Sequence, residues 1–334
     1  MQIEKDIINT TLSESLIEQI KNKAEKLQLL KRELSRHVVG NNETINLMLF
    51  AMLCNGHILL EGVPGVAKTT MIRSFAELLG LNFKRIQFTP DLLPSDLIGT
   101  VIYNSKTQNF ETKRGPIFAN IVLADEINRA PAKVQSALLE SMQEHQVTIG
   151  SETHKLEEPF FVFATQNPVE QEGTYQLPEA QLDRFLFKAI VGYPAIEDEL
   201  KILKLKSVKK IESVVSRSDI LESQKLVESI YMDEKISQYI VNIVWATRDP
   251  EKLLRKEVKN WISLGASPRA TIAMYHSAKA HAFLNKRHFV IPDDVKAIAI
   301  PVLRHRIIQS YEAQAENITT DFIAQTILDS ITTP

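Results

Sequence analysis

Residues 57–69, HILLEGVPGVAKT, indicate the fold class of this chain, because they predict a strand, a loop and a helix in succession. Residues 57–60, a histidine followed by three apolar residues, predict a short buried strand. The glycine-containing turn predicts a tight loop, and a helix is expected to begin at Lys68. Backbone N–H groups of such a loop, with the unpaired N–H groups at the start of the helix, bind phosphate oxygens. Lys68 adds a positive charge, and Thr69 is placed to bind Mg²⁺. The segment therefore predicts a nucleoside triphosphate site.

This loop differs at one position from the phosphate-binding consensus G-x-x-x-x-G-K-[ST], because Ala67 replaces the second glycine. Alanine takes a positive φ only at a cost, so we expect Gly65 to take any left-handed turn of the loop. The alternative interpretation is a strand-to-helix turn that binds no ligand. The nucleotide-binding residues expected here are Gly62, Val63, Pro64, Gly65, Val66, Ala67, Lys68, Thr69 and Thr70.

Length and composition indicate a globular protein of two domains. The chain has 334 residues, 44% of them hydrophobic, and a formal net charge of −2, which provides no overall basic field for non-specific nucleic-acid binding. Its single cysteine, Cys54, cannot form an intramolecular disulfide, which favours a reducing compartment, and we expect this thiol to be buried. The N-terminus lacks a signal-peptide pattern, and no apolar run reaches the roughly 18 residues of a membrane-spanning helix. We therefore expect a cytoplasmic protein without membrane insertion.

Short apolar runs alternate with helical patterns along the first part of the chain. This alternation predicts an α/β fold with a parallel sheet that is covered by helices on both faces. The five expected strands are 57–60, 83–88, 119–124, 160–165 and 185–191, and the expected helices are 12–35, 43–53, 68–79 and 131–144. Two segments interrupt the alternation, 98–112 and 146–157, and each predicts a hairpin that projects from the core.

The pattern changes after residue 192, beyond which we expect only helices. The charged stretch 201–210 is interpreted as a solvated helix face, with an anion-binding patch as the alternative. The expected organisation is a helical segment at 1–36, a nucleotide-binding domain with both hairpins at 37–192, and a helical domain at 193–334.

Polar side chains follow two of the expected strands. Asp125 and Glu126 come directly after the strand at 119–124, and Asn167 follows the strand at 160–165. Because ligands bind at the carboxyl ends of parallel strands, all three are expected beside the phosphate loop. Asp125 would bind Mg²⁺, Glu126 would deprotonate the attacking water, and Asn167 would hold that water or the terminal phosphate. The alternatives are a helix-start signal for the two acids and a turn before proline for Asn167.

Five motifs, taken together and in this order, resemble the MoxR family of AAA+ ATPases. They are Gly62–Thr69, Asp125–Pro131, Ala164–Pro168, Pro178–Phe185 and Gly265–Arg269. The resemblance extends over nearly the whole chain, and the family's phosphate loop carries the same alanine variant. It implies a P-loop AAA+ core with a parallel five-stranded sheet, an all-helical lid domain, and ATP and Mg²⁺ as cofactors.

The resemblance also implies roles for three residues outside the phosphate loop. Asn167 would be sensor 1, Arg184 the arginine finger offered to the nucleotide of a neighbouring subunit, and Arg269 sensor 2 on the lid. A guanidinium in such a position stabilises charge on the transferring phosphoryl group. The alternatives are a surface ion pair with Asp183 for Arg184, and a simple helix-start residue for Arg269.

Further residues match the family less closely. Val39 and Gly40 resemble the first two residues of the adenine-side V-G-Q element, although Asn41 replaces the glutamine. Arg114 and Arg129 are additional candidates for contacts across a subunit junction. We therefore include Val39 and Gly40 among the expected nucleotide-binding residues.

The function that the resemblance implies is an ATP-hydrolysing chaperone that assembles as a ring, with a hexamer as the expected form. Its partners would be a protein with a von Willebrand factor A domain and a protein client, which it would remodel, mature or load with metal. The two hairpins match inserts that face the ring pore or the client. Similar inserts occur in replicative helicase rings, so a nucleic-acid motor is the alternative, which the balanced charge disfavours. A nucleotide-gated module without turnover is a third hypothesis. The residues that argue against it are the intact Lys68, Asp125, Glu126 and Asn167.

Overall fold

The computed structural model describes residues 2–168, 174–204, 211–250 and 256–334, without the side chains of 2–13 and 256–257. The chain forms two compact units. We call Leu30–Arg217 the core unit, and Met1–Leu29 together with Ser218–Pro334 the helical unit. The helix α1 (Gln2–His37) contributes to both units. The domain limits expected from the sequence stay a prediction.

The core unit is built on a parallel sheet with the strand order β2-β5-β8-β1-β9. Its strands are β1 (Ile58–Glu61), β2 (Phe83–Gln87), β5 (Ile121–Asp125), β8 (Phe161–Gln166) and β9 (Phe187–Ile190). The predicted parallel five-stranded sheet is therefore confirmed. The order places β8 between β1 and β5, so the phosphate loop and the two acids follow strands that are separated by one other strand.

Helices cover both faces of this sheet because successive side chains of a strand point to opposite faces. Val122 and Val162 belong to the buried cluster that also contains Leu138 of α5, whereas Phe163 points the other way and packs edge-on against Phe75 of α3. The helical elements of the core unit are α2 (Asn42–Leu53), α3 (Lys68–Leu78), α4 (Pro94–Ile98), η1 (Pro116–Phe118), η2 (Ile127–Arg129), α5 (Ala132–Glu144), α6 (Glu179–Leu182) and α7 (Ile196–Lys204).

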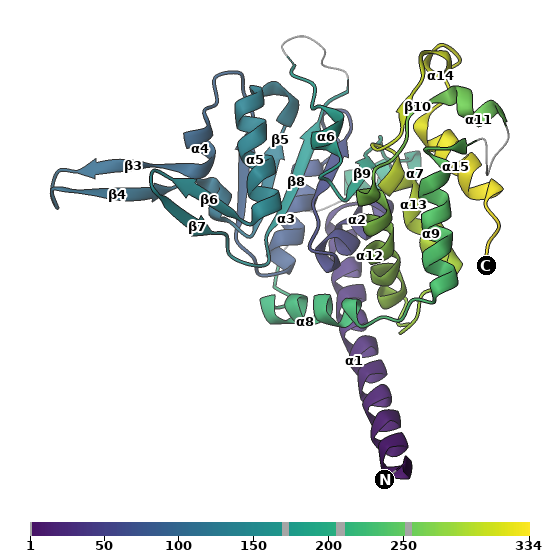
Figure 1. The fold of residues 1–334 in the computed structure, drawn as a ribbon. Coiled ribbons are helices and arrows are strands. Elements are labelled where there is room, and N and C mark those ends of the chain that lie inside the picture. Colours follow the sequence, from purple (N-terminus) through teal and green to yellow (C-terminus); the bar gives the residue numbers. More distant parts are fainter. Residues whose placement is uncertain (1, 169–173, 205–210, 251–255) are drawn as a thin grey trace. The chain divides into compact units, whose positions relative to one another are not determined.

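Two antiparallel hairpins lie outside the sheet. One pairs β3 (Gly99–Asn104) with β4 (Asn109–Arg114), and the other pairs β6 (Gln146–Ile149) with β7 (Glu152–Lys155). The β3–β4 hairpin extends away from the sheet (Figure 1). Tyr103 and Phe110 are cross-strand partners on it, with ring centroids 5.4 Å apart, and the Phe110 side chain is 75% exposed. This hairpin thus presents an aromatic pair to solvent.

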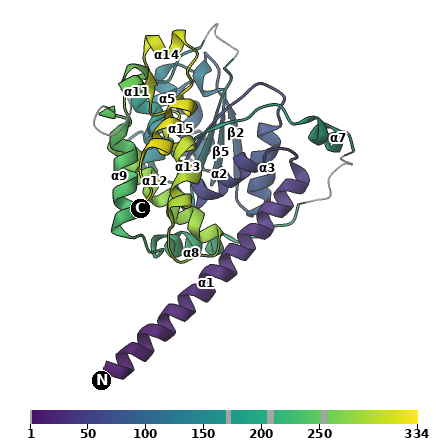
Figure 2. The ribbon, with the colours of Figure 1, turned by 90° about the vertical axis from the view of Figure 1, so that its right-hand side faces the viewer.

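The helical unit is built around four packed helices, α9, α12, α13 and α15 (Figures 1 and 2). Its elements after α1 are α8 (Arg217–Glu228), α9 (Glu234–Ala246), α11 (Lys256–Trp261), β10 (Ile262–Leu264), α12 (Pro268–Leu284), α13 (Pro292–Leu303), β11 (Ile308–Gln309), α14 (Tyr311–Ala315) and α15 (Thr320–Ser330). The predicted helical lid is confirmed, but β10 and β11 add an antiparallel ladder that we did not predict. Strands of three and two residues are too short to show an alternating pattern.

Two smaller expectations concern Cys54 and the charged stretch 201–210. Cys54 is half-buried at the C-terminus of α2, so the expectation of a buried thiol is wrong. Lys201 and Lys204 are exposed on α7, while residues 205–210 of the charged stretch lie outside the described residues. Among the residues that the structure describes, no helix is long and apolar enough to cross a membrane.

Candidate nucleotide-binding site

The loop between β1 and α3 contains two left-handed residues. Gly65 has φ +87°, as expected, but Ala67 also has φ +61° and directly precedes α3. The expectation that Gly65 alone takes the left-handed turn is therefore wrong. This conformation costs an L-residue about 1–2 kcal/mol, and such strain is typical of functional loops. At Gly62 a Cβ atom would lie 2.3 Å from the carbonyl oxygen of Val191, so only glycine fits there.

This loop forms one wall of a cavity of about 440 Å³ in the core unit. The other walls come from the carboxyl ends of β2, β5 and β8. The lining residues are Pro64, Gly65, Val66, Ala67, Lys68, Thr69, Thr70, Arg85, Asp125, Glu126, Thr165 and Asn167. The fold thus brings the phosphate loop, both predicted acids and Asn167 around a single cavity.

Lys68 is half-buried at the start of α3. Its amine donates a hydrogen bond to the carbonyl oxygen of Gly62, at the beginning of the loop. Burial lowers the pKa of the Lys68 ammonium, and the charges of Asp125, Glu126 and Glu61 oppose that shift. The lysine therefore lies in a cavity where carboxylates favour its charged form.

Both carboxylate oxygens of Asp125 have partners within the chain. Oδ1 accepts a hydrogen bond of 2.6 Å from the Thr165 hydroxyl. Oδ2 accepts one of 2.9 Å from Nε of Arg85, whose Nη2 lies 2.7 Å away. Neither Arg85 nor Thr165 is among the residues that the sequence predicts for this site. The only signal for Arg85 was the alternation of polar, buried and polar residues at Arg85-Ile86-Gln87, which does not say what the polar face contacts.

The carboxylate of Glu126 is held by two donors. Its Oε2 accepts a hydrogen bond of 2.8 Å from the Gln87 amide and lies 3.1 Å from Nε of Arg129. The backbone of Glu126 is left-handed, with φ +57°, and its N–H donates to the Thr165 hydroxyl at 2.8 Å. The Thr165 hydroxyl therefore links the backbone of Glu126 to the carboxylate of Asp125. Gln87 is a further site residue that the sequence does not predict.

The donor set of this cavity fits Mg²⁺. Oxygen ligands are available from the Thr69 hydroxyl and the Asp125 carboxylate, which line the same space. Within the described ranges there is no cluster of three or more His, Cys, Asp or Glu side chains that could hold a metal by themselves. Mg²⁺ in phosphoryl-transfer sites usually has only one or two protein carboxylates and takes its other ligands from water and phosphates. A small protein donor set is thus what such a site needs.

The remaining predicted residues do not line this cavity. Gly40 has φ +85°, and a Cβ atom there would lie 3.0 Å from Oδ2 of Asp198, so this segment packs against α7. Arg184 is half-buried after α6, where its Nη1 donates to the carbonyl oxygen of Leu139 at 3.0 Å. Its Nε is buried with no hydrogen-bond partner among the described residues. Arg269 belongs to the helical unit, where its N–H is capped by the Ser267 hydroxyl at the start of α12.

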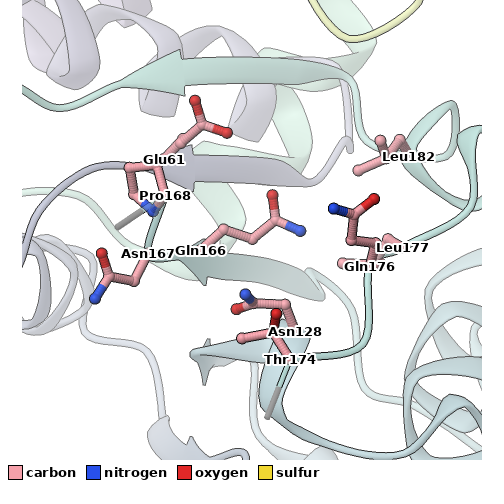
Figure 3. A pocket seen from close by; sticks show the side chains of 9 residues that line it. All are labelled: Glu61, Asn128, Gln166, Asn167, Pro168, Thr174, Gln176, Leu177 and Leu182. Carbon is pink, nitrogen blue, oxygen red and sulfur yellow. The ribbon is translucent and has the colours of Figure 1, made fainter. Parts of the chain in front are cut away.

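A second cavity of about 480 Å³ shares Asn167 with the first (Figure 3). It is lined by Glu61, Asn128, Gln166, Asn167, Pro168, Thr174, Gln176, Leu177 and Leu182. Side-chain amides of Asn128, Gln166 and Gln176 face this space in Figure 3. The oxygen Oδ1 of Asn128 is buried without a hydrogen-bond partner in the described part of the chain. Asn167 thus lies where a polar cavity adjoins the phosphate loop.

Two family models match this chain, one in the core unit and one in the helical unit. Residues 57–187 match the ATPase family associated with various cellular activities (AAA), and residues 255–327 match the AAA lid domain. Chaperone MoxR1 of Mycobacterium tuberculosis (strain ATCC 25618 / H37Rv) is 47% identical over 304 residues, which cover 90% of this chain and 81% of that protein. The chain belongs to the MoxR family of AAA+ ATPases.

A second relative and a solved structure agree with this assignment. Protein MoxR of Paracoccus denitrificans is 32% identical, with 84% of this chain and 88% of that protein covered. The crystal structure of an inferred ATPase from Cytophaga hutchinsonii superposes with a TM-score of 0.91 at 48% identity, and covers 96% of this chain and 98% of that one. The family and the AAA+ fold that the motifs indicated are therefore confirmed, and membership of an ATPase family implies that the chain binds nucleotide.

Proposed function

We propose that this MoxR-family chaperone hydrolyses ATP to ADP and phosphate with Mg²⁺, and uses the hydrolysis to remodel a protein client. The observation that carries the proposal is the arrangement of the phosphate loop, Lys68, Asp125, Glu126 and Asn167 around one cavity. The loop N–H groups and Lys68 would bind the phosphates. Thr69 and Asp125 would hold Mg²⁺, which neutralises charge that develops on the phosphoryl oxygens.

In this proposal Glu126 is the general base and Asn167 positions the attacking water. A base needs its carboxylate within hydrogen-bond reach of the water, but Oε2 of Glu126 is held by Gln87 and Arg129. For Oε2 to accept the proton of the water, the carboxylate would have to leave at least one of these donors. In this view the contacts with Gln87 and Arg129 restrain the base.

We propose that the active site is completed by a neighbouring subunit of a ring, with a hexamer as the expected form. Arg184 would leave the carbonyl oxygen of Leu139 and act as the arginine finger, an effect worth about 10³–10⁵ in rate where it has been measured. We expect Arg184→Ala to bind ATP but not to turn it over. Mixing it with Lys68→Ala subunits should restore part of the activity, and no recovery in rings shown to be mixed would contradict a finger that acts in trans.

Two further roles extend the proposal to the lid and the adenine. Arg269 would contact the phosphates as sensor 2, and Val39 with Gly40 would border the adenine. The packing of Gly40 against Pro194 and Asp198 supports the second role, because Gly62 of the phosphate loop packs against Val191, in the same short segment of chain.

For the client we propose a protein that is matured or loaded with metal together with a partner containing a von Willebrand factor A domain. The exposed pair Tyr103 and Phe110 on the β3–β4 hairpin offers an apolar contact for an unfolded segment of such a client. The nucleic-acid motor is not favoured, since the relatives named above include a chaperone and the net charge is −2.

The test of hydrolysis is a comparison of Glu126→Gln with wild type in an assay of phosphate release and an assay of ATP binding. We expect binding to persist and turnover to fall by at least about 10²-fold, as for loss of a general base. Glu140→Gln is the matched control, because Glu140 is an exposed carboxylate on α5. Turnover in Glu126→Gln equal to wild type would refute the mechanism.

The client is identified by a pull-down from cell extract with Glu126→Gln held in its ATP state. Lys68→Ala serves as the comparison that lacks the phosphate contact, and nuclease treatment removes nucleic acid. Recovery of a von Willebrand factor A protein, or of a metalloenzyme subunit, would support the proposal. Nuclease-sensitive recovery of replication or repair proteins would contradict it.

A further inference from the structure

The cavity contains a cation, Arg85, for which the proposed mechanism gives no role. Its guanidinium bonds to Oδ2 of Asp125 through Nε, at 2.9 Å, and Nη2, at 2.7 Å. The same Nη2 donates to the side-chain oxygen of Gln87 at 2.8 Å, and the Gln87 amide donates to Glu126. One guanidinium therefore contacts the expected Mg²⁺ ligand and the residue that restrains the expected base.

The position of Arg85 follows from the ladder between β2 and β5. Gln87 pairs with Asp125 in the register, and the Phe88 N–H donates to the Asp125 carbonyl oxygen at 2.9 Å. Residues 85 and 87 share one face of the strand, while Ile86 points into the core. The contact is thus built into the sheet rather than into a loop.

Arg85 and Mg²⁺ cannot both occupy the same oxygen of Asp125. Arg85 fills both lone-pair sites of Oδ2 through Nε and Nη2, whereas Thr165 fills one site of Oδ1. A metal bound through Oδ2 would therefore displace the guanidinium, and a metal bound through Oδ1 would compete with it for the charge of the same carboxylate. A dication in near-octahedral coordination excludes a guanidinium from the same carboxylate oxygen, both by space and by charge. The Arg85 side chain is 47% exposed, so it has room to turn away.

We propose that Arg85 is an internal cation that competes with Mg²⁺ for Asp125. The inference rests on the proposed function, because that function assigns Asp125 to the metal. Arg85 holds the carboxylate until the metal–nucleotide complex displaces it. Displacement breaks the network from Arg85 through Gln87 to Glu126, so that binding of the metal–nucleotide also loosens the restraint on the base.

The test is the Mg²⁺ dependence of nucleotide binding, which needs no turnover. Binding of a fluorescent ADP analogue, N-methylanthraniloyl-ADP, is measured over a series of Mg²⁺ concentrations for wild type, Arg85→Gln and Arg85→Lys. We expect the Mg²⁺ midpoint in Arg85→Gln to fall by about three- to tenfold, the range for loss of a partly exposed ion pair with two charge-assisted hydrogen bonds. Arg85→Lys should shift the midpoint less and in the same direction, because lysine keeps the charge without the planar fork.

Lys84→Gln is the matched control, since it removes an equal charge from the neighbouring, exposed position of β2. Its midpoint should equal that of wild type. Asp125→Asn separates the two proposals: if it keeps the wild-type response to Mg²⁺, the metal role of Asp125 fails and the inference fails with it. If Asp125→Asn loses the response but the folded Arg85 variants keep the wild-type midpoint, or move to higher Mg²⁺, only the role of Arg85 is overturned. Circular dichroism establishes whether each variant is folded. If Arg85→Gln does not fold, the Mg²⁺ midpoint of Arg85→Lys tests the proposal.

Discussion

Acid should destabilise this protein through one buried histidine, His57, which directly precedes β1. The ring is fully buried and joins two elements of the core unit. Its Nδ1 accepts a hydrogen bond of 3.1 Å from the Val162 N–H of β8, and its Nε2 lies 3.1 Å from the carbonyl oxygen of Met142 in α5. Because Nδ1 is an acceptor here, the proton belongs on Nε2, and a second proton would break the bond to Val162.

The size of the effect follows from the pKa of His57. Burial lowers this pKa from 6.5 to about 4, while the bond to the Met142 carbonyl opposes the shift and the neighbouring His145 adds to it. Between pH 6.5 and pH 4 the unfolded chain binds a proton that the folded chain does not, so stability falls as pH falls. At about 1.4 kcal/mol per unit of pKa difference, His57 accounts for a loss of about 3 kcal/mol by pH 4, and for none above pH 7.

The assay is urea unfolding, followed by far-ultraviolet circular dichroism, at pH 7.5, 6.5, 5.5 and 4.5 (chosen to span the window set by the two pKa values). His57→Gln should be less stable than wild type at pH 7.5 and lose less stability as the pH falls, because it lacks the titrating ring. His288→Gln, at an exposed histidine, should follow the wild-type curve and controls for the loss of a histidine. The reasoning is refuted if wild type and His57→Gln show parallel curves across this range.

Three other predictions concern backbone strain, the restraint on the base and a buried ion pair. Ala67→Gly should raise the free energy of unfolding by about 0.5–1 kcal/mol, because glycine takes φ +61° without strain but adds entropy to the unfolded chain; lower stability by urea unfolding would contradict this. Gln87→Ala should raise basal ATP turnover by about two- to tenfold, since Glu126 loses a hydrogen bond worth about 0.5–1.5 kcal/mol, and unchanged phosphate release would count against the restraint. Asp294→Ala should destabilise the helical unit by about 3–5 kcal/mol, because its buried carboxylate pairs with Arg287 through both oxygens; a loss below about 1 kcal/mol by tryptophan fluorescence would disprove this.

The elements of the core and the family could be predicted from the residues alone. A loop such as 57–69 can be predicted from the sequence because its chemistry is local: the glycines, the lysine and the hydroxyl act within a few residues of one another. Buried strands of a parallel sheet can likewise be recognised as short apolar runs between segments of helical periodicity. All five strands lie close to their predicted limits. The order of the family's motifs then indicated an ATPase with a helical lid, which the fold and the relatives bear out.

The side chains that surround the two acids could not be predicted in this way, because they depend on the arrangement of the strands. Strand order depends on side-chain packing summed over the whole sheet, and no local pattern encodes it. Placing β2 and β8 on either side of β5 brings Arg85 and Thr165 to Asp125, and Gln87 to Glu126, across distances of about 40 residues in the chain.

The same limit explains the one local expectation that failed in the loop. The left-handed backbone of Ala67 is imposed on the loop by the elements that it joins, against the preference of the residue itself. The groups that bind phosphate can be predicted from local sequence. The conformation and the neighbours of these groups depend on the packing of strands that are distant in the chain.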